Sequence, residues 1–318
     1  MIILDRLCKS YGPVEALRDL SLSVEAGEIV GLLGPNGAGK TTAMKIITCY
    51  MPPTSGSVSV DGRDTVAEAL EVRRRIGYLP ENNPLYHEMS VAEYLDFAAR
   101  LHGLAPADAP RAIDRAVGQC GLGDYRHRLI GHLSKGFRQR VGLAQAMLHD
   151  PDVLIMDEPT SGLDPNQILE IRHLIRELGR AKTVILSTHI MQEVEAVCSR
   201  VLIINRGRIV ADDTAENLLR QRAGTVRYAV ELRAFNQDPL AVEAALRERL
   251  PIRELDAHAV EGDLRVTLTP AAGEDLREAI FHLAVEQGWA LLELSRSQNT
   301  LEDVFRELTT GESLEAAA

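Results

Sequence analysis

Residues 34–42 constrain the fold of this chain more than any other segment. They read Gly-Pro-Asn-Gly-Ala-Gly-Lys-Thr-Thr and match the pattern G-x-x-x-x-G-K-[ST]. The apolar residues 29–33 precede this pattern and are typical of a buried strand, whereas residues 43–47 after it favour a helix. Such a pattern between a strand and a helix indicates a phosphate-binding loop in an α/β fold, rather than a glycine-rich turn without a ligand.

The residue types in this loop suit the phosphates of a nucleotide. Glycines let successive backbone N–H groups point inward, and the start of the following helix directs its positive dipole end at the same negative charge. Lys40 supplies a mobile cation, and Thr41 supplies a hydroxyl that can bind Mg²⁺. We therefore expect the phosphates to be held by Gly34, Pro35, Asn36, Gly37, Ala38, Gly39, Lys40, Thr41 and Thr42.

Length and composition narrow the class of protein further. The chain has 318 residues, of which 45% are hydrophobic, and this length suggests about two domains. No apolar run reaches the roughly 18 residues of a membrane span, and the N-terminus lacks the features of a signal peptide, so we expect a soluble, cytoplasmic chain. The net charge of −11 argues against nucleic-acid binding, and the four scattered cysteines argue against a zinc site or a disulfide framework.

The spacing of apolar residues places further elements along the chain. Strands are predicted at 2–7, 16–24, 57–60, 74–79, 153–156, 183–187, 201–205 and 208–211. Helices are predicted at 91–101, 110–120, 166–178 and 214–219, and another begins after Ser134 and continues through 141–148. We interpret residues 1–222 as a nucleotide-binding domain of the α/β class, with a mixed sheet and an inserted helical subdomain at about 88–150.

Residues 223–310 form a second, smaller α+β domain in this interpretation. Its predicted order is strand, helix, strand, strand, helix, strand, at 226–233, 240–250, 254–260, 264–268, 274–286 and 289–294, followed by a helix at 300–308. This order fits a ferredoxin-like fold. Residues 311–318 are expected to be a flexible tail, and the sequence of the second domain contains no motif for phosphate, a metal or a nucleophile.

Charged side chains follow two of the apolar strands that we predict for the sheet. Asp157 and Glu158 come directly after residues 153–156, and His189 comes shortly after residues 183–187. Two adjacent carboxylates at the end of a buried strand are costly unless they have partners or a chemical task. We expect Asp157 on the Mg²⁺ side and Glu158 toward an attacking water, because successive strand residues point in opposite directions. The alternative for Asp157 and Glu158 is a structural ion pair, and the alternative for His189 is a purely structural role.

Two other positions leave alternatives open on the residues alone. Tyr11 is predicted in a turn near the phosphate loop, where its ring could stack on a purine or pack against the protein. Ser134 stands at the N-cap position of a helix, so it either caps a helix with a basic face or forms part of a second anion site.

The motifs, in their order along the chain, resemble those of the ATP-binding subunit of ABC transporters. The phosphate loop is followed by Leu133-Ser134-Lys135-Gly136, Ile155-Met156-Asp157-Glu158, Ser161-Gly162-Leu163-Asp164 and Ser187-Thr188-His189. This match extends over about two thirds of the chain. The C-terminal part, with residues 301–305, resembles the accessory domain of ATPases that serve ABC-2 type permeases, including the drug, sodium and gliding-motility branches.

The resemblance implies a role for each motif residue. Tyr11 would stack on adenine, Asp157 would be the carboxylate on the magnesium side, Glu158 the general base and His189 the switch residue at the γ-phosphate. Lys40 would act in catalysis as well as in binding. The family pairs two ATPase subunits head to tail, with ATP between the phosphate loop of one and the signature of the other, which corresponds here to Leu133-Ser134-Lys135-Gly136-Phe137. The nucleotide contacts of such a pair would also include Ser134, Gly136 and Asp164.

The resemblance also implies partners and a location. We expect an ATPase that uses ATP and Mg²⁺, forms a homodimer or pairs with another ATPase subunit, and lies on the cytoplasmic face of the membrane against a separate permease. Coupling to the permease is expected through the helical subdomain and residues 81–86. The alternative is a soluble ABC ATPase that acts on ribosomes or nucleic acid, but this sequence shows neither a second ATPase domain nor a long coiled coil. A phosphate-loop kinase would have no place for Glu158, the signature serine and His189.

The sequence departs from the family pattern at two places. The signature Leu-Ser-Gly-Gly-Gln is Leu133-Ser134-Lys135-Gly136-Phe137 here, and Glu81 stands where a glutamine is common. An ionised glutamate only accepts hydrogen bonds and adds negative charge beside the phosphates. Glu81 therefore either binds Mg²⁺, directly or through water, or turns toward the permease, and we favour the metal side. Neither departure removes the lysine or a catalytic carboxylate, so an active ATPase is expected.

Overall fold

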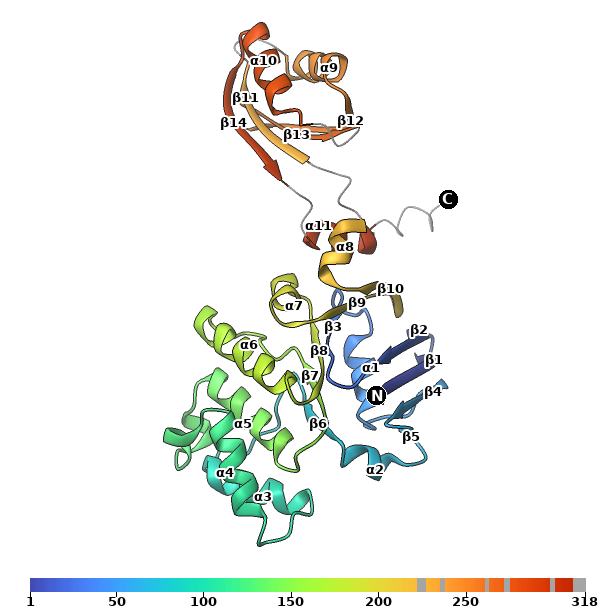
Figure 1. The fold of residues 1–318 in the computed structure, drawn as a ribbon, viewed down its shortest axis with the longest axis vertical. Coiled ribbons are helices and arrows are strands. Elements are labelled where there is room, and N and C mark those ends of the chain that lie inside the picture. Colours follow the sequence, from blue (N-terminus) through green and yellow to red (C-terminus); the bar gives the residue numbers. More distant parts are fainter. Residues whose placement is uncertain (222–226, 235–237, 261–262, 272–274, 298–300, 311–318) are drawn as a thin grey trace. The chain divides into compact units, whose positions relative to one another are not determined.

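The computed structural model describes residues 1–221, 227–234, 238–260, 263–271, 275–297 and 301–310 (Figure 1). Contacts within the chain divide it into two compact units, Met1–Ala215 and Glu216–Ala318. The expected flexible tail, residues 311–318, lies outside the described residues, as do the first residues of the elements predicted to begin at 226, 274 and 300. No helix in the described ranges is both long and apolar enough to cross a membrane.

A six-stranded sheet forms the centre of the first unit. Its order is β10-β9-β3-β8-β7-β6, and every neighbouring pair is parallel except β9 and β10. The strands are β3 Ile29–Leu33, β6 Ile76–Leu79, β7 Val153–Asp157, β8 Thr183–Thr188, β9 Arg200–Asn205 and β10 Arg208–Asp213. Every residue of β7 and β8 is buried, which explains the apolar runs at 153–156 and 184–186 within them. Parallel strands end at the same edge of a sheet, so the residues that follow β3, β7 and β8 meet there.

An antiparallel sheet packs with the first helix against this centre. Its order is β2-β1-β4-β5. The elements are β1 Ile2–Tyr11, β2 Val14–Val24, β4 Ser55–Val60, β5 Arg63–Asp64 and the helix α1 Lys40–Ile47. One apolar cluster joins both sheets and the helix, and it includes Leu4, Leu20, Val30, Met44 and Ile155. Burial of this apolar area fixes the N-terminus of α1 close to the end of β3.

A helical subdomain is inserted between β6 and β7. It contains α3 Val91–Leu101, α4 Ala109–Gln119 and α5 Lys135–Met147. Ser134 accepts a hydrogen bond from the Phe137 N–H and so caps α5, which confirms the predicted N-cap. The cap fixes the orientation of the Ser134 hydroxyl at the start of α5.

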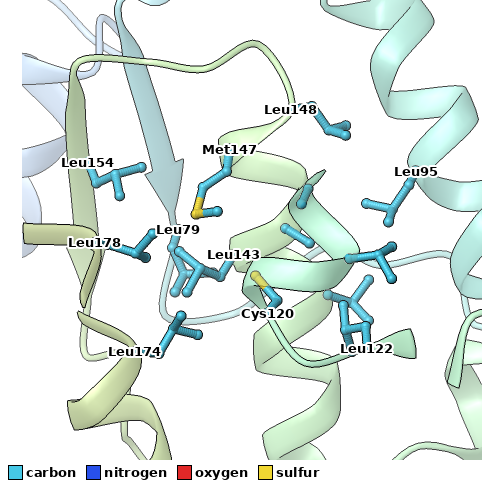
Figure 2. Close-up of a cluster of buried hydrophobic side chains, with 14 of the residues drawn as sticks. Leu79, Leu95, Cys120, Leu122, Leu143, Met147, Leu148, Leu154, Leu174 and Leu178 are labelled. Atoms are coloured by element: carbon cyan, nitrogen blue, oxygen red, sulfur yellow. The ribbon is translucent and has the colours of Figure 1, made fainter. Parts of the chain in front are cut away.

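Buried apolar side chains join the helical subdomain to the central sheet (Figure 2). Leu79, the last residue of β6, and Leu154, the second residue of β7, share one cluster with Leu143 and Met147 of α5. The helix α6 Pro165–Gly179 contributes further leucines to the same cluster. The position of α5 relative to β7 is therefore set by apolar packing.

Two short helices, α2 Ala69–Arg73 and α7 Met191–Val197, were not predicted. They have five and seven residues, too few for a period of about 3.6 residues to be recognised in the sequence. The prediction was also wrong about Tyr11, which ends β1 instead of lying in the turn. The turn consists of Gly12 and Pro13, so the strand continues further than its apolar alternation suggests.

The second unit contains a four-stranded antiparallel sheet of order β12-β13-β11-β14. Its elements are β11 Arg227–Arg233, α9 Pro239–Arg249, β12 Ile252–Val260, β13 Asp263–Pro270, α10 Arg277–Gln287 and β14 Ala290–Ser297, with α8 Ala215–Gln221 before them and α11 Leu301–Thr310 after them. The two helices α9 and α10 share one apolar cluster with Tyr228, Val230 and Leu232, so they cover the same face of the sheet. This order of elements and strands is the predicted ferredoxin-like arrangement.

We predict that Leu143→Ala lowers the free energy of unfolding by about 2–5 kcal/mol, because it leaves a cavity between α5 and the sheet. Leu143 is 1% exposed in the cluster of Figure 2. Leu169→Ala is the matched control, because Leu169 is 62% exposed on α6. Its loss should change stability by less than about 0.5 kcal/mol. Urea denaturation measures both variants, and equal losses would contradict this packing.

Candidate functional site

The phosphate loop connects β3 to α1 and requires glycine at two points. A Cβ on Gly34 would collide with the backbone oxygen of Ile204, and a Cβ on Gly39 would lie 2.7 Å from the backbone oxygen of Ala16. Gly39 also has a φ of 110°, in the left-handed region that favours glycine. The loop can therefore pass close to its neighbours and lead into α1, whose first N–H groups have no partner within the helix.

The loop borders a cavity of about 440 Å³. Besides residues 35–42 of the loop, the lining contains Ala16, Glu81, Glu158, Ser161 and His189. The cavity thus brings together the loop after β3, the segments after β7 and β8, and residue 81 after β6. This convergence is the one that the parallel sheet predicts.

Lys40 is the buried cation of the site. Its side chain is 6% exposed, and Nζ lies 3.5 Å from Glu158 Oε1. Nζ also donates a hydrogen bond to the carbonyl oxygen of Gly34 at 2.7 Å. A charge withdrawn from water in this way needs nearby oxygens, which the carbonyl and the carboxylate supply. The same ammonium can bind phosphate oxygens at the loop.

Asp157 ends β7 with its carboxylate buried and hydrogen-bonded. Oδ1 accepts one hydrogen bond from the Thr41 hydroxyl at 3.2 Å and another from the Ser187 hydroxyl at 2.5 Å. Ser187 is the register partner of Asp157 between β7 and β8, so the sheet brings the two side chains together. Carboxylate and hydroxyl oxygens are hard ligands of the kind that Mg²⁺ prefers. Thr41 and Asp157, two of the predicted metal ligands, are therefore in contact.

Glu158 leaves the strand in a strained conformation. Its φ is 49°, in the left-handed region, although the following residue, Pro159, favours an extended predecessor. Strain of this kind costs on the order of 1–3 kcal/mol and persists where the surrounding structure enforces it. The Glu158 N–H donates to Ser187 Oγ at 3.0 Å. Because β7 ends at Asp157, this left-handed turn, and not alternation along a strand, brings Glu158 to the cavity, and the expected reason was wrong.

His189 meets Glu158 just after the end of β8. Its Nδ1 lies 2.9 Å from Glu158 Oε2, and its side chain is 48% exposed. Both oxygens of Glu158 are therefore engaged, Oε1 by Lys40 and Oε2 by His189. A carboxylate flanked by a cation and an imidazole at the wall of a cavity can accept a proton from a water there.

Tyr11, Ser134, Gly136 and Asp164, predicted as nucleotide contacts, do not line the phosphate cavity of their own chain. The Tyr11 hydroxyl donates to the sulfur of Met51 at 3.0 Å, and the ring is 46% exposed. Its stacking on adenine therefore stays a prediction.

The other three residues lie around Gln167 on α6. The Ser134 hydroxyl accepts a hydrogen bond from Gln167 Nε2 at 3.5 Å. Asp164 Oδ1 accepts the Gln167 N–H at 2.9 Å and caps α6. A Cβ on Gly136 would lie 2.7 Å from the Gln167 side chain. The signature and the segment after Glu158 thus form one contiguous group within the chain.

Two polar residues that contact the site were not singled out from the sequence. Ser187 bonds Asp157, and Glu193 of α7 accepts the hydroxyls of Thr160 and Thr188. A signal for Ser187 was its place at the end of the predicted strand 183–187, because parallel strands end at the same edge and Asp157 follows the predicted strand 153–156. A signal for Glu193 was an acid between apolar residues that recur at helical spacing, although the helix is short.

A larger cavity of about 720 Å³ adjoins the site and shares Thr41, Glu81 and Asp157 with the groups described above. It extends to Tyr78 and His149. Burial, and next the carboxylate of Asp157, raise the pKa of Tyr78. Burial, and next the stacked ring of His102, lower the pKa of His149 to about 4. The phenol and this imidazole are therefore both uncharged near neutral pH.

Comparisons with known proteins give consistent matches. Residues 17–161 match the sequence pattern of the family described as ABC transporter. The chain is 42% identical over 218 residues to the ABC transporter ATP-binding protein NatA of Bacillus subtilis (strain 168), and the match covers 68% of this chain and 89% of that protein. It is 33% identical over 307 residues to the bacitracin transport ATP-binding protein BcrA of Bacillus licheniformis, with 96% of each chain covered.

A solved structure is also similar to this chain. It is a dimeric, post-hydrolysis state of the ATP-binding cassette MJ0796 bound to ADP and Pi, with 25% identity and a TM-score of 0.62. The match covers 67% of this chain and 98% of that chain.

We predict that Lys40→Ala abolishes nucleotide binding or turnover, because the variant loses the buried cation that can bind phosphate oxygens and leaves the charge of Glu158 uncompensated. Lys45→Ala is the control, since Lys45 lies on the same helix, 5.6 Å from the Tyr50 ring, and does not line the phosphate cavity. Binding of a fluorescent ATP analogue and release of phosphate are measured for both. Wild-type turnover by Lys40→Ala would overturn the assignment of the loop.

Proposed function

This chain belongs to the family of ABC transporter ATP-binding subunits, and we propose that it is the ATP-hydrolysing motor of an ABC-2 type exporter. The observation that carries this proposal is Glu158, held between Lys40 and His189 at the cavity of the phosphate loop. A carboxylate in this position suits the activation of a water that attacks the γ-phosphate. The match to a bacitracin transport protein over nearly the whole chain supports the transport assignment.

Each residue of this group has a defined task in the proposed reaction. Lys40 Nζ exchanges its contacts with Gly34 and Glu158 for phosphate oxygens, which compensates their negative charge. Glu158 then accepts a proton from the attacking water at Oε1, the oxygen that Lys40 releases. His189 Nδ1 holds the other oxygen of Glu158, and its half-exposed ring can reach a phosphate oxygen in the cavity.

The residues around Asp157 fit Mg²⁺. The Thr41 hydroxyl and the Asp157 carboxylate are oxygen donors 3.2 Å apart, of the hard kind that Mg²⁺ prefers. Thr41 and Asp157 would hold the ion, Ser187 would keep the carboxylate oriented, and Glu81 is the further proposed ligand. When bound, the ion would neutralise part of the charge on the phosphates.

We further propose that two subunits pair head to tail with ATP between them. Ser134, Gly136 and Asp164 do not line the phosphate cavity of their own chain, and in the proposed pair they would close the cavity of the second subunit. The related cassette MJ0796 was solved as a dimer bound to ADP and Pi. A nucleotide shared by two chains holds them together, and its hydrolysis releases them.

The proposed contact with a separate permease lies at the cavity of about 720 Å³. Glu81 lines both this cavity and the phosphate cavity. Tyr86, which is 50% exposed, packs edge to face against Phe97 of α3 with 5.6 Å between ring centroids. A permease segment bound here would touch the nucleotide side and the helical subdomain together, and it would place this subunit at the cytoplasmic face of the membrane. The subunit is not proposed to bind nucleic acid.

Glu158→Gln should still bind ATP but hydrolyse it at least about 100-fold more slowly, because an amide does not accept the proton of the attacking water. The variant should also accumulate as a dimer in ATP, since the bridging nucleotide persists. Glu177→Gln, an exposed change on α6, serves as the control. Phosphate release and light scattering measure the two effects. A monomer in saturating ATP would reject the shared nucleotide, and an unchanged rate would reject the general base.

Glu81→Gln should keep ATP hydrolysis but need a higher Mg²⁺ concentration for half-maximal rate, because an amide binds Mg²⁺ more weakly than a carboxylate does. Glu88→Gln, in the same loop and exposed, should leave this requirement unchanged. Rates are measured across a Mg²⁺ titration, with and without the permease. An unchanged requirement with loss of permease-stimulated activity alone would place Glu81 in coupling and reject the metal role.

A further inference from the structure

We propose that Glu193 is a positioning residue that ties the backbone around Glu158 to the backbone around His189. Glu193 lies on α7, is 2% exposed, and has no task in the reaction proposed above. The inference rests on the proposed function, because a positioning role has meaning only if Glu158 and His189 act on ATP.

The two oxygens of the Glu193 carboxylate accept hydrogen bonds from two different segments. Oε1 accepts from the Thr160 hydroxyl, and Oε2 accepts from the Thr188 hydroxyl at 2.7 Å. Thr160 lies two residues after Glu158, and Thr188 directly precedes His189. One side chain therefore joins the segment after β7 to the end of β8.

The burial of these groups argues for a task beyond folding. Thr160 and Thr188 are 3% and 0% exposed, so the two hydroxyls are withdrawn from water together with the carboxylate. A buried carboxylate is costly even when hydroxyls satisfy its oxygens, so burial by itself disfavours an acid at this position. Apolar burial alone therefore does not account for an acid at this position.

The tie acts on both sides of the contact between Glu158 and His189. Glu158 has a left-handed φ of 49° before a proline, and such a backbone persists only where its surroundings hold it. Thr160 anchors the chain just beyond this strained link. On the other side, the Thr188 hydroxyl accepts the Ile190 N–H at 3.0 Å and fixes the turn that carries His189. Glu193 thus holds the two backbone segments at the positions that leave Glu158 Oε2 and His189 Nδ1 2.9 Å apart.

The first test compares ATP hydrolysis by Glu193→Gln and Glu193→Ala with that of the wild type. The first variant removes one acceptor and the second removes both, so kcat should fall about 10-fold and about 100-fold respectively, with KM for ATP changed by less than about twofold. Glu195→Gln is the matched control, because Glu195 is exposed on the same helix, and it should keep the wild-type kcat. An unchanged kcat in Glu193→Gln and Glu193→Ala would overturn the inference.

A double-mutant cycle separates positioning from folding. Because the proposed tie positions His189 as well as Glu158, Glu193→Gln should lower kcat by a clearly smaller factor in the His189→Ala background than in the wild type. An equal loss in both backgrounds would reject the positioning role. Thr188→Val should reproduce the loss of kcat. Thr188→Ser keeps the hydroxyl and should therefore retain most of the wild-type kcat. This pair of variants gives the same test if Glu193→Ala does not fold, and equal rates in the pair would count against the inference.

Glu158→Gln, measured in the same assay, keeps the two proposals apart. Loss of hydrolysis in Glu158→Gln together with a full kcat in Glu193→Gln and Glu193→Ala rejects the role of Glu193 and leaves the proposed function standing. Wild-type hydrolysis in Glu158→Gln rejects the catalytic assignment itself, and with it the positioning role.

Discussion

The burial of a single cation, Lys40, is the constraint on which the site depends. An ammonium that is 6% exposed is stable here because the Gly34 oxygen accepts its hydrogen bond at 2.7 Å and the Glu158 carboxylate lies at 3.5 Å. These two partners follow β3 and β7, which are separated in the sheet by β8. The charge of Lys40 is therefore compensated only when the strands pair in this order. The same order brings His189, which follows β8, to the Glu158 carboxylate. Fold and chemistry are joined at this point.

Sequence-based prediction succeeded where the signal is local. The phosphate loop is defined by its own residues and by the strand and helix that flank it. The burial of β7 and β8 could be predicted from the continuous apolar runs at 153–156 and 184–186. The cap at Ser134 depends on the three residues that follow it. In the second unit, the order of the strands and of α9, α10 and α11 could likewise be read from periodicity alone, because these elements are long enough to show their period.

The contacts that orient the site are not local, and no pattern in the sequence carries them. Ser187 and Asp157 meet because β7 and β8 pair in one register, although the two residues are 30 positions apart. The left-handed backbone of Glu158 is favoured neither by a glutamate nor by the proline after it, so it follows from tertiary contacts. Glu193 acts from a helix too short to be predicted. The sequence therefore identifies the candidate groups of the site, and the packing determines where they point.

The segment after Glu158 also links the phosphate cavity to the signature within one chain. Thr160 is anchored by Glu193, and further on Gln167 contacts Ser134 at the start of α5. Between them, Gly162 has a left-handed φ of 68°, and a Cβ there would collide with the ammonium of Lys135. The lysine that departs from the usual signature thus lies against the backbone of this segment, where a glycine would leave the contact unmade.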